Sequence, residues 1–227
     1  MTDDDSLEAN LRSIRQAITR SAERAGRDPG EVVLVAVTKT VPVERIREAI
    51  GLGLTRLGEN RVQEALPKIE EIGPADLDWH LIGHLQTNKV KFIEGRFRMV
   101  QSIDSVGLAE ALDHRLESPL DVLIEVNVAE EPQKTGALPA DLTAVARAVN
   151  GAEHLRLRGL MTVAPMVADA EQVRPVFLGL RSLRDATSQQ LGLPLPVLSM
   201  GMTDDYPVAI EEGATMLRLG RALFGPR

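Results

Sequence analysis

The stretch VVLVAVTK, residues 32–39, is almost continuously apolar and rich in β-branched residues before it ends in a lysine and a threonine. Such a run indicates a strand that is covered on both faces, as the strands of parallel sheets are. Further stretches of this kind follow along the chain. They are 54–60, 77–84, 99–104, 121–128, 157–163, 196–201 and 216–220, and DVLIEVNV (121–128) is the clearest of them.

Helical patterns lie between these stretches. Val43, Ile46 and Ile50 recur at steps of three and four, which indicates a helix with one apolar face. The helical segments are 43–50, 61–72, 86–95, 105–117, 139–150, 169–191 and 204–213. Pro67 is expected to kink or break the second of them, because proline lacks the amide that a helix needs.

Strands that each lead into a helix predict an α/β fold, a single closed (β/α)8 TIM barrel. Leu7, Leu11 and Ile14 predict an additional helix, at about residues 6–26, ahead of the first strand. An open doubly wound sheet is the alternative, but no glycine-rich dinucleotide fingerprint follows the first strand. No linker or low-complexity tract divides the chain, so residues 1–227 are expected to form one domain.

The composition excludes several classes of function. The 227 residues contain no cysteine, which removes disulfides, thiolate nucleophiles and cysteine-bound metals. A net charge of −7 and an aromatic content of 3% argue against nucleic-acid binding, which uses cationic surfaces and stacking rings. No run approaches the roughly 20 apolar residues of a membrane span. Because the first residues are acidic, unlike a signal peptide, a cytoplasmic location is expected.

In such a barrel, the C-terminal ends of the strands carry the chemistry. The candidate site residues at those ends are mostly polar or small. They are Lys39, Glu59, Asn60, His80, His84, Ser102, Asp104, Asn127, Met161, Thr162, Ser199, Gly201, Arg218, Gly220 and Arg221. Burial of Lys39 at the end of an apolar strand would favour its neutral amine, the form that attacks a carbonyl. The alternative is a lysine whose ammonium group reaches solvent.

Two neighbouring loops have features that suit a phosphate. Residues 199–205 and 218–221 place small residues and backbone N–H groups at the start of a helix, after the seventh and eighth strands. Ordinary turns with an aspartate cap are the alternative. His80 and His84 on one extended strand would lie about 13 Å apart, so no metal site is predicted. Glu59 and Asp104 are expected to pair with a nearby lysine or arginine.

Several motifs occur in a characteristic order. They are AVTKT (36–40), GEN (58–60), VQE (62–64), WHLIGHLQTNK (79–89), GLMT (159–162), SMGM (199–202) and RLG (218–220). Together they resemble the pyridoxal 5′-phosphate (PLP) homeostasis family, of the YggS/PROSC type, over roughly residues 30–227. The resemblance implies a single barrel similar to the N-terminal domain of alanine racemase.

The resemblance also implies a role for each site residue. Lys39 would hold PLP covalently as a Schiff base, an imine with the cofactor aldehyde. The phosphate would bind Ser199, Gly201, Gly220 and the backbone of Arg221; Arg218 would face the pyridine nitrogen, Asn60 would lie beside the ring, and His80 and Met161 would line the pocket. Arg61, Thr203 and Arg221 depart from the residues common in the family, which are Tyr, Ser and Thr.

The function implied is intracellular PLP (vitamin B6) homeostasis without catalysis by the protein itself, so no catalytic residue is assigned. A cationic Arg218 would keep the ring nitrogen unprotonated and so weaken the electron sink of PLP enzymes. The resemblance implies that alanine racemases take a catalytic tyrosine from a second domain. This chain is expected to lack that domain, and its one tyrosine, Tyr206, is a poor substitute. The alternatives are an amino-acid racemase, a class I aldolase that uses Lys39, and an interaction protein with a vestigial barrel. The expected partners are PLP and apo PLP-dependent enzymes, and the expected state is a monomer.

Overall fold

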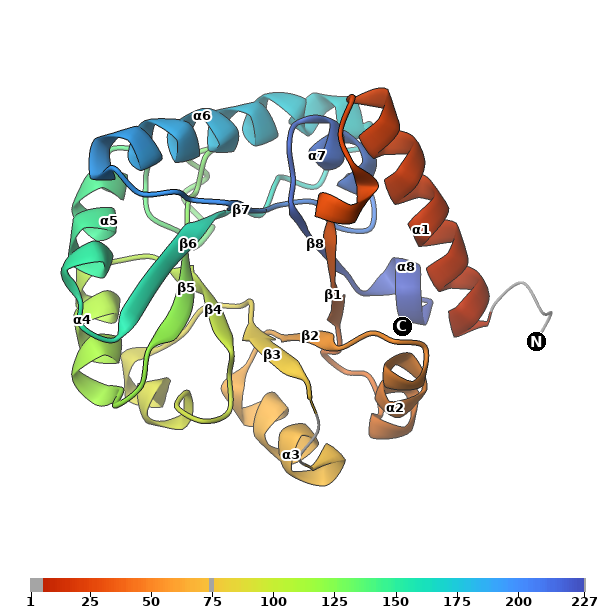
Figure 1. The fold of residues 1–227 in the computed structure, drawn as a ribbon, viewed down its shortest axis with the longest axis horizontal. Coiled ribbons are helices and arrows are strands. Elements are labelled where there is room, and N and C mark those ends of the chain that lie inside the picture. Colours follow the sequence, from red (N-terminus) through yellow and green to blue (C-terminus); the bar gives the residue numbers. More distant parts are fainter. Residues whose placement is uncertain (1–5, 74–75, 227) are drawn as a thin grey trace.

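The apolar run at residues 32–39 forms β1 (Val33–Val37), which pairs in parallel with a strand on each side. Its neighbours are β2 (Arg56–Glu59) and β8 (Met216–Leu219), the next strand and the last strand in the chain. Because the first strand pairs with the last, the sheet closes into a barrel in the order β1 to β8 (Figure 1). The computed structural model describes residues 6–73 and 76–226.

The remaining strands are β3 (Asp78–Leu81), β4 (Met99–Ile103), β5 (Leu120–Glu125), β6 (Leu155–Met161) and β7 (Val197–Ser199). All neighbouring strands pair in parallel. Several strands end before the predicted stretches do, because the polar residues that follow turn away into loops. The predicted closed (β/α)8 barrel is confirmed.

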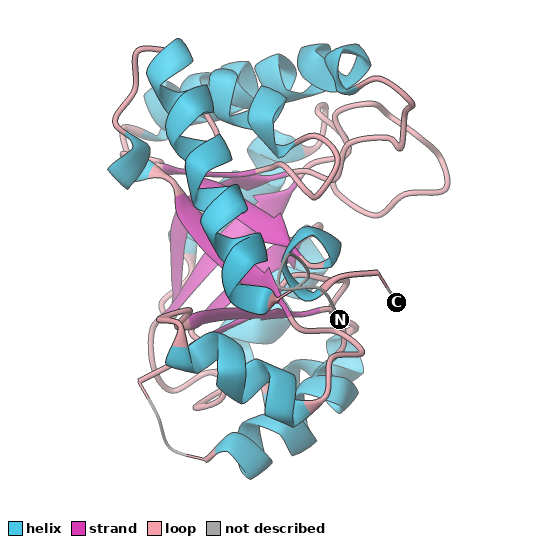
Figure 2. Ribbon diagram, turned by 90° about the vertical axis from the view of Figure 1, so that its right-hand side faces the viewer, coloured by secondary structure: helices cyan, strands magenta, loops and turns pink. Residues whose placement is uncertain are grey.

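Helices surround the strands (Figure 2). They are α1 (Leu7–Arg24), α2 (Val43–Gly51), α3 (Val62–Ile72), α4 (Val106–Arg115), α5 (Leu142–Gly151), α6 (Arg174–Leu191), α7 (Tyr206–Glu211) and α8 (Arg221–Phe224), with 3₁₀ turns η2 (Pro29–Glu31), η3 (Thr87–Phe92) and η4 (Ala170–Val173). The helix predicted at 86–95 is thus a 3₁₀ turn. Within the described residues, no helix combines the length and the apolar character that a membrane crossing needs.

The apolar side chains form two layers. Inside the barrel, side chains from strands around its circumference meet one another: Val35, Met99, Leu123, Met161 and Met216. The larger layer lies between the strands and the helices and includes Leu57, Ile124 and Phe177. Burial on both sides of the sheet explains why the strands are continuous apolar runs.

The additional N-terminal helix, α1, closes the outer layer at one side of the barrel. The hydroxyl group of Ser6 caps it by accepting from the amide of Ala9 at 3.1 Å. Its apolar face packs against α7 and α8, and the side-chain amide of Asn10 donates to the Leu223 carbonyl at 3.0 Å. The first described helix and the last one are therefore joined directly (Figure 1).

Pro67 does not break the helix, because α3 continues from Val62 to Ile72; the predicted kink stays a prediction. A proline inside a helix removes one N–H donor, here the partner of the Gln63 carbonyl. The rest of α3 keeps its own hydrogen bonds and its contacts with α2 and β2, so a single missing bond does not end the helix.

Candidate cofactor site at the barrel mouth

A cavity of about 590 Å³ opens at the C-terminal ends of the strands. It brings together segments that are far apart in the sequence, since its lining includes Lys39 after β1, Asn60 after β2, residues 202–205 after β7, and Gly220 and Arg221 after β8. Arg218 of β8 also contributes to it. The loop after β6 adds an apolar wall made of Val163, Pro165, Met166, Val167 and Ala168.

Five of the residues predicted from the sequence therefore share this cavity: Lys39, Asn60, Arg218, Gly220 and Arg221. Four others do not line it. Met161 lies in the apolar layer inside the barrel, and His80, Ser199 and Gly201 are buried close to the strand ends. The predicted contacts of these four residues with a ligand stay predictions.

A buried chain of polar side chains crosses the barrel interior. Gln101 donates from Nε2 to Nδ1 of His80 at 2.9 Å and accepts at Oε1 from the Ser199 hydroxyl at 2.6 Å. Arg218 donates from Nη1 to Ser199 Oγ at 2.6 Å and from Nη2 to the carbonyl of Thr162 at 2.7 Å. Burial lowers the pKa of His80 to about 4, so its ring is neutral at pH 7 and accepts the Gln101 bond. This series of hydrogen bonds fixes the plane of the Arg218 guanidinium group.

Arg218 keeps its charge although it is buried. Burial lowers its pKa to about 10, and the carboxylates of Glu125 and Asp205 oppose that shift. Burial raises the pKa of both carboxyl groups. Glu125 accepts from the Thr135 hydroxyl at 2.8 Å, and Asp205 accepts from the Met202 amide at 2.6 Å. The cavity therefore meets a fixed cation whose charge is balanced by two neighbouring carboxyl groups, those of Glu125 and Asp205.

The turn after β7 requires glycine at position 201. Gly201 has φ +96, and an added Cβ would lie 2.8 Å from the Cβ of Ala209 and 3.0 Å from Cδ2 of Leu217. Any side chain would push the turn away from α7 and β8. The glycine therefore lets the backbone of the following residues run close to the body of the barrel while they line the cavity.

The two loops predicted to bind phosphate are linked to each other. The Thr203 hydroxyl, after β7, accepts from the amide of Ala222 in α8 at 3.2 Å. At the rim, Arg221 donates to the carboxylate of Asp204. These contacts make the loops after β7 and β8 one unit on a single side of the cavity.

The backbone of Asn60 lies against that of Gly83, a residue of the WHLIGHLQTNK motif. An added Cβ on Gly83 would lie 2.4 Å from the Asn60 carbonyl oxygen. The Gly83 carbonyl in turn accepts from the Ser102 hydroxyl at 2.7 Å. The close contact of two backbones explains why this loop needs a residue without a side chain.

The predictions for the second histidine and for Asp104 need correction. β3 ends at Leu81, so His84 lies in the following loop rather than on the strand. Its Nδ1 pairs with Oδ2 of Asp104 at 3.0 Å, so the partner of Asp104 is a histidine and not a lysine or arginine. Glu59 pairs with Lys68 at 2.7 Å, as predicted. Over the residues that the structure describes, no group of three His, Asp or Glu side chains is arranged to hold a metal.

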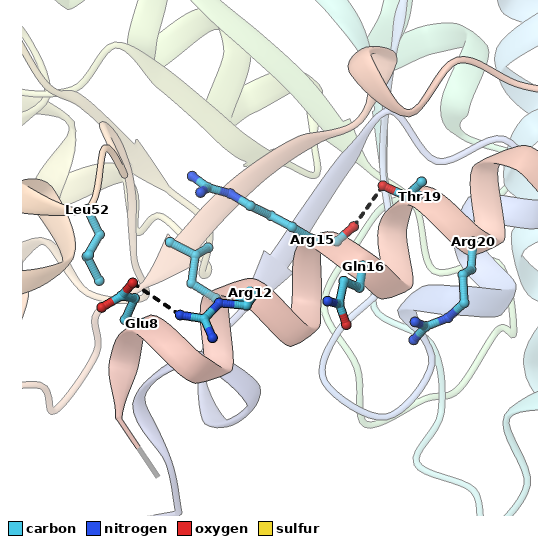
Figure 3. Close-up of a pocket in the computed structure, with 8 residues that line it drawn as sticks. Glu8, Arg12, Arg15, Gln16, Thr19, Arg20 and Leu52 are labelled. Carbon is cyan, nitrogen blue, oxygen red and sulfur yellow. Dashed lines mark hydrogen bonds and ion pairs between the residues drawn. The ribbon is translucent and has the colours of Figure 1, made fainter. Parts of the chain in front are cut away.

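A second hollow, of about 480 Å³, runs along α1 away from the strand ends (Figure 3). Leu11 and Leu52 form part of it, and the other residues are polar side chains on the exposed side of α1. In Figure 3, Glu8 contacts Arg12, and the Thr19 hydroxyl donates to the carbonyl of Arg15 in its own helix. None of the predicted site residues lies there.

The comparisons with known proteins agree with this geometry. The family model for the alanine racemase N-terminal domain matches residues 3–227. A pyridoxal phosphate homeostasis protein from Aquifex aeolicus is 44% identical over 96% of each chain, and one from Escherichia coli is 38% identical over 96% of this chain and 95% of the other. The structure of PipY from Synechococcus elongatus, solved with PLP bound, has a TM-score of 0.81 and 38% identity, and covers 92% of this chain and all of that one. An alanine racemase from Corynebacterium glutamicum has the same fold, with a TM-score of 0.70 and 18% identity, over 96% of this chain and 62% of the other.

The fold and the site thus define a barrel of the alanine racemase N-terminal type. Within that class, the chain belongs to the family of the pyridoxal phosphate homeostasis proteins. The family resemblance inferred from the motifs is confirmed.

Proposed function

We propose that this protein binds PLP at the barrel mouth, holds it through a covalent bond to Lys39, and serves intracellular vitamin B6 homeostasis. The observation that carries the proposal is the shared cavity of Lys39, Arg218 and the loops after β7 and β8. Its volume of about 590 Å³ suits a small cofactor. A relative of 38% identity, PipY, has been solved with PLP bound.

The residues at this cavity fit the chemical groups of PLP. PLP supplies an aldehyde and an electron-withdrawing ring. Lys39 brings a primary amine, and the turn at Gly201 together with the loop at Gly220 brings backbone close to the cavity beside the cation of Arg221. Arg218 presents a fixed guanidinium group, which donates hydrogen bonds and does not accept a proton. This donor set suits a phosphate and an unprotonated ring nitrogen.

We propose that the protein stores and releases PLP and does not itself turn over amino acids. Racemisation needs an acid and a base on opposite faces of the substrate. Tyr206 does not line the cavity; it is half-buried, and burial raises the pKa of its hydroxyl group, with the charge of Arg20 on α1 opposing that rise. The test measures how fast the α-proton of L-alanine exchanges with solvent in D₂O in the presence of PLP-loaded protein. Exchange that is faster than with free PLP would replace this part of the proposal by a racemase-like activity.

The proposed recipients of the stored cofactor are apo PLP-dependent enzymes in the cytoplasm. A transfer assay with loaded protein and an apo-enzyme tests this step. Reactivation faster than with an equal concentration of free PLP supports direct transfer, and equal rates indicate simple release into solution.

The first experiment is an absorption spectrum with PLP, followed by borohydride reduction and peptide mass mapping. We expect a visible band that reduction removes, and a pyridoxyl mass on Lys39. Lys39→Ala should lose the band, because the amine is gone, whereas Lys91→Ala should keep it, because Lys91 is exposed on η3 and does not line the cavity. A label scattered over surface lysines would contradict the proposal.

A further inference from the structure

The backbone on both sides of Lys39 is bonded to one cluster of charged side chains. Lys68 of α3 donates from Nζ to the Thr38 carbonyl at 2.7 Å, to Glu59 Oε1 at 2.7 Å and to Glu64 Oε1 at 2.9 Å. An ammonium group has three N–H donors, so these contacts use all of them. The residue before Lys39 is therefore anchored to α3 and to β2 at once.

The residue after Lys39 is anchored to the same cluster. Thr40 has φ +60, in the left-handed region that β-branched residues rarely adopt. Its amide donates to Oε1 of Glu64, the oxygen that also accepts from Lys68. Since such a turn persists only when its surroundings impose it, the bond to Glu64 is part of what holds this backbone shape.

Glu59 of the cluster is fully buried and Lys68 largely so, and the cluster lies outside the cavity. The side chain of Glu59 is 0% exposed and that of Lys68 is 11% exposed, and neither lines the cavity, nor does Glu64. Glu59 also accepts from the Thr38 hydroxyl at 2.6 Å. Burial raises the pKa of Glu59, and the contacts with Lys68 and Thr38 oppose that rise. Lys68 and Glu64 bond directly to the turn that carries Lys39, so we expect their effect on a ligand in the cavity to pass through that turn.

We infer that Lys68, with Glu59 and Glu64, is a positioning residue that fixes the turn at 38–40 so that the Lys39 amine meets the cofactor aldehyde. The inference rests on the proposed function, because it presumes that Lys39 is the covalent attachment point. In that step the Lys39 nitrogen forms a double bond to the aldehyde carbon, and the aldehyde oxygen leaves as water with the two amine protons. The cluster acts on this step and not on phosphate or ring binding.

The experiment compares two ligands in the same variants. PLP has the aldehyde, and pyridoxine 5′-phosphate has an alcohol in its place with the same ring and phosphate. In Lys68→Met we expect the Kd for PLP to rise about tenfold or more and the reducible band to weaken, while the Kd for pyridoxine 5′-phosphate changes less than about twofold. A defect of the whole cavity would weaken both ligands equally, and that result would overturn the inference.

Three further variants serve as controls for charge and for helix docking. Glu64→Gln keeps an oxygen acceptor for the Thr40 amide, so it should bind PLP more tightly than Glu64→Ala, which keeps none. Arg47 donates to the Glu71 carbonyl at 2.8 Å and so holds α3 to α2 away from the turn. Arg47→Met should leave both ligand affinities unchanged. If Lys68→Met does not fold, the Glu64 pair carries the comparison, since the Glu64 side chain is 29% exposed.

Amide hydrogen exchange at Thr40, followed by NMR in cofactor-free protein, separates this inference from the proposed function. We expect exchange to accelerate about tenfold or more in Lys68→Met and Glu64→Ala relative to Arg47→Met. Unchanged exchange would overturn the positioning role even if Lys39 binds PLP. If wild-type protein does not bind PLP at Lys39, the proposed function fails, and the exchange rates still decide whether the cluster fixes the turn.

Discussion

Arg218 remains charged inside the barrel because its surroundings offset much of the cost of burial. A buried cation is costly unless it is hydrogen-bonded and balanced by opposite charge. Arg218 has hydrogen bonds to Ser199 and Thr162, and the carboxylates of Glu125 and Asp205 supply the balancing charge. The planar fork of arginine carries its donors on separate nitrogens, Nη1 and Nη2, which reach two acceptors that a single ammonium nitrogen does not span.

Arg218→Lys should therefore lower both the stability of the protein and its affinity for PLP, although it preserves the charge. We expect the free energy of unfolding to fall by about 1–3 kcal/mol, because one of the two acceptors loses its donor. PLP affinity should fall about tenfold. Urea unfolding and a PLP titration measure the two effects. Arg221→Lys is the control at the exposed rim, where we expect the free energy of unfolding to fall by less than about 1 kcal/mol. Equal losses of stability in the two variants would contradict the argument.

His80 makes stability depend on pH in a defined direction. Its pKa is about 4 in the folded protein, because of burial, against a usual value of 6.5. As the pH falls from about 6.5 to about 4, the unfolded chain takes up a proton that the folded protein does not, so stability decreases by up to about 3 kcal/mol. His80→Gln should lose less stability than wild type over this range. Urea unfolding of both proteins between about pH 7.5 and 4 tests this, and parallel curves would contradict it.

At the scale of elements, β6 and β7 approach so closely at one point that only glycine fits. An added Cβ on Gly159 would lie 1.8 Å from the Val197 carbonyl oxygen. Gly159 also follows the register shift between β5 and β6, where Val122 pairs with Leu157 and Leu123 with Gly159. The approach brings the end of β6 beside β7, whose following turn lines the cavity.

Gly159→Ala should be severely destabilising for this reason. We expect a loss of at least about 3 kcal/mol or failure to fold, because the atom in the way is backbone and cannot rotate aside. Gly107→Ala is the matched control, since Gly107 lies in α4 with no atom within 4 Å of an added Cβ. It should stabilise the protein by up to about 1 kcal/mol. Thermal unfolding of the two variants measures both effects, and a Gly159→Ala protein with wild-type stability would contradict the close approach.

The helices and strands were predictable from the sequence where burial determines the pattern of apolar residues. Strands covered on both faces appear as apolar runs, and helices appear as stripes of apolar residues. Their ends were less predictable: the region around His84 reads as strand because its apolar neighbours continue the pattern, but the structure turns there to pair His84 with Asp104. The break that the sequence allowed at Pro67 does not occur, because the contacts of α3 with α2 and β2 offset the local cost of the proline.

At the scale of the whole molecule, topology explains which site residues were predictable. The strand ends converge at one mouth, so Lys39, Asn60 and Arg218 were found from their positions alone. Whether a residue at a strand end faces the cavity or the barrel interior depends on the stagger between strands, which the sequence does not state. Ser199 is an example, with its hydroxyl bonded inside the barrel. Lys68 was missed because a Glu–Lys pair four residues apart on a helix resembles an ordinary surface pair.

We expect the protein to be a monomer in solution. Among the described residues, large apolar side chains that are exposed are few, and three of them, Val163, Met166 and Val167, lie together on the loop beside the cavity. A stable dimer buries about 800 Å² and roughly 20–30 residues on each partner, whereas this patch consists of three apolar side chains on one loop. Light scattering coupled to size exclusion should give 24.7 kDa at all concentrations. A mass near twice that value would contradict the expectation.

The pairing of β1 with β8 also sets the order of events when the chain is synthesised. The ribosome makes Lys39 well before the strand that closes the barrel beside it, Met216–Leu219. At roughly 5–20 residues per second, that interval lasts on the order of 10–40 s. During this time the reactive amine exists without the loops at 199–205 and 218–221. The growing chain therefore completes its cofactor cavity only after Met216–Leu219 has been made, in one step with the closure of the fold.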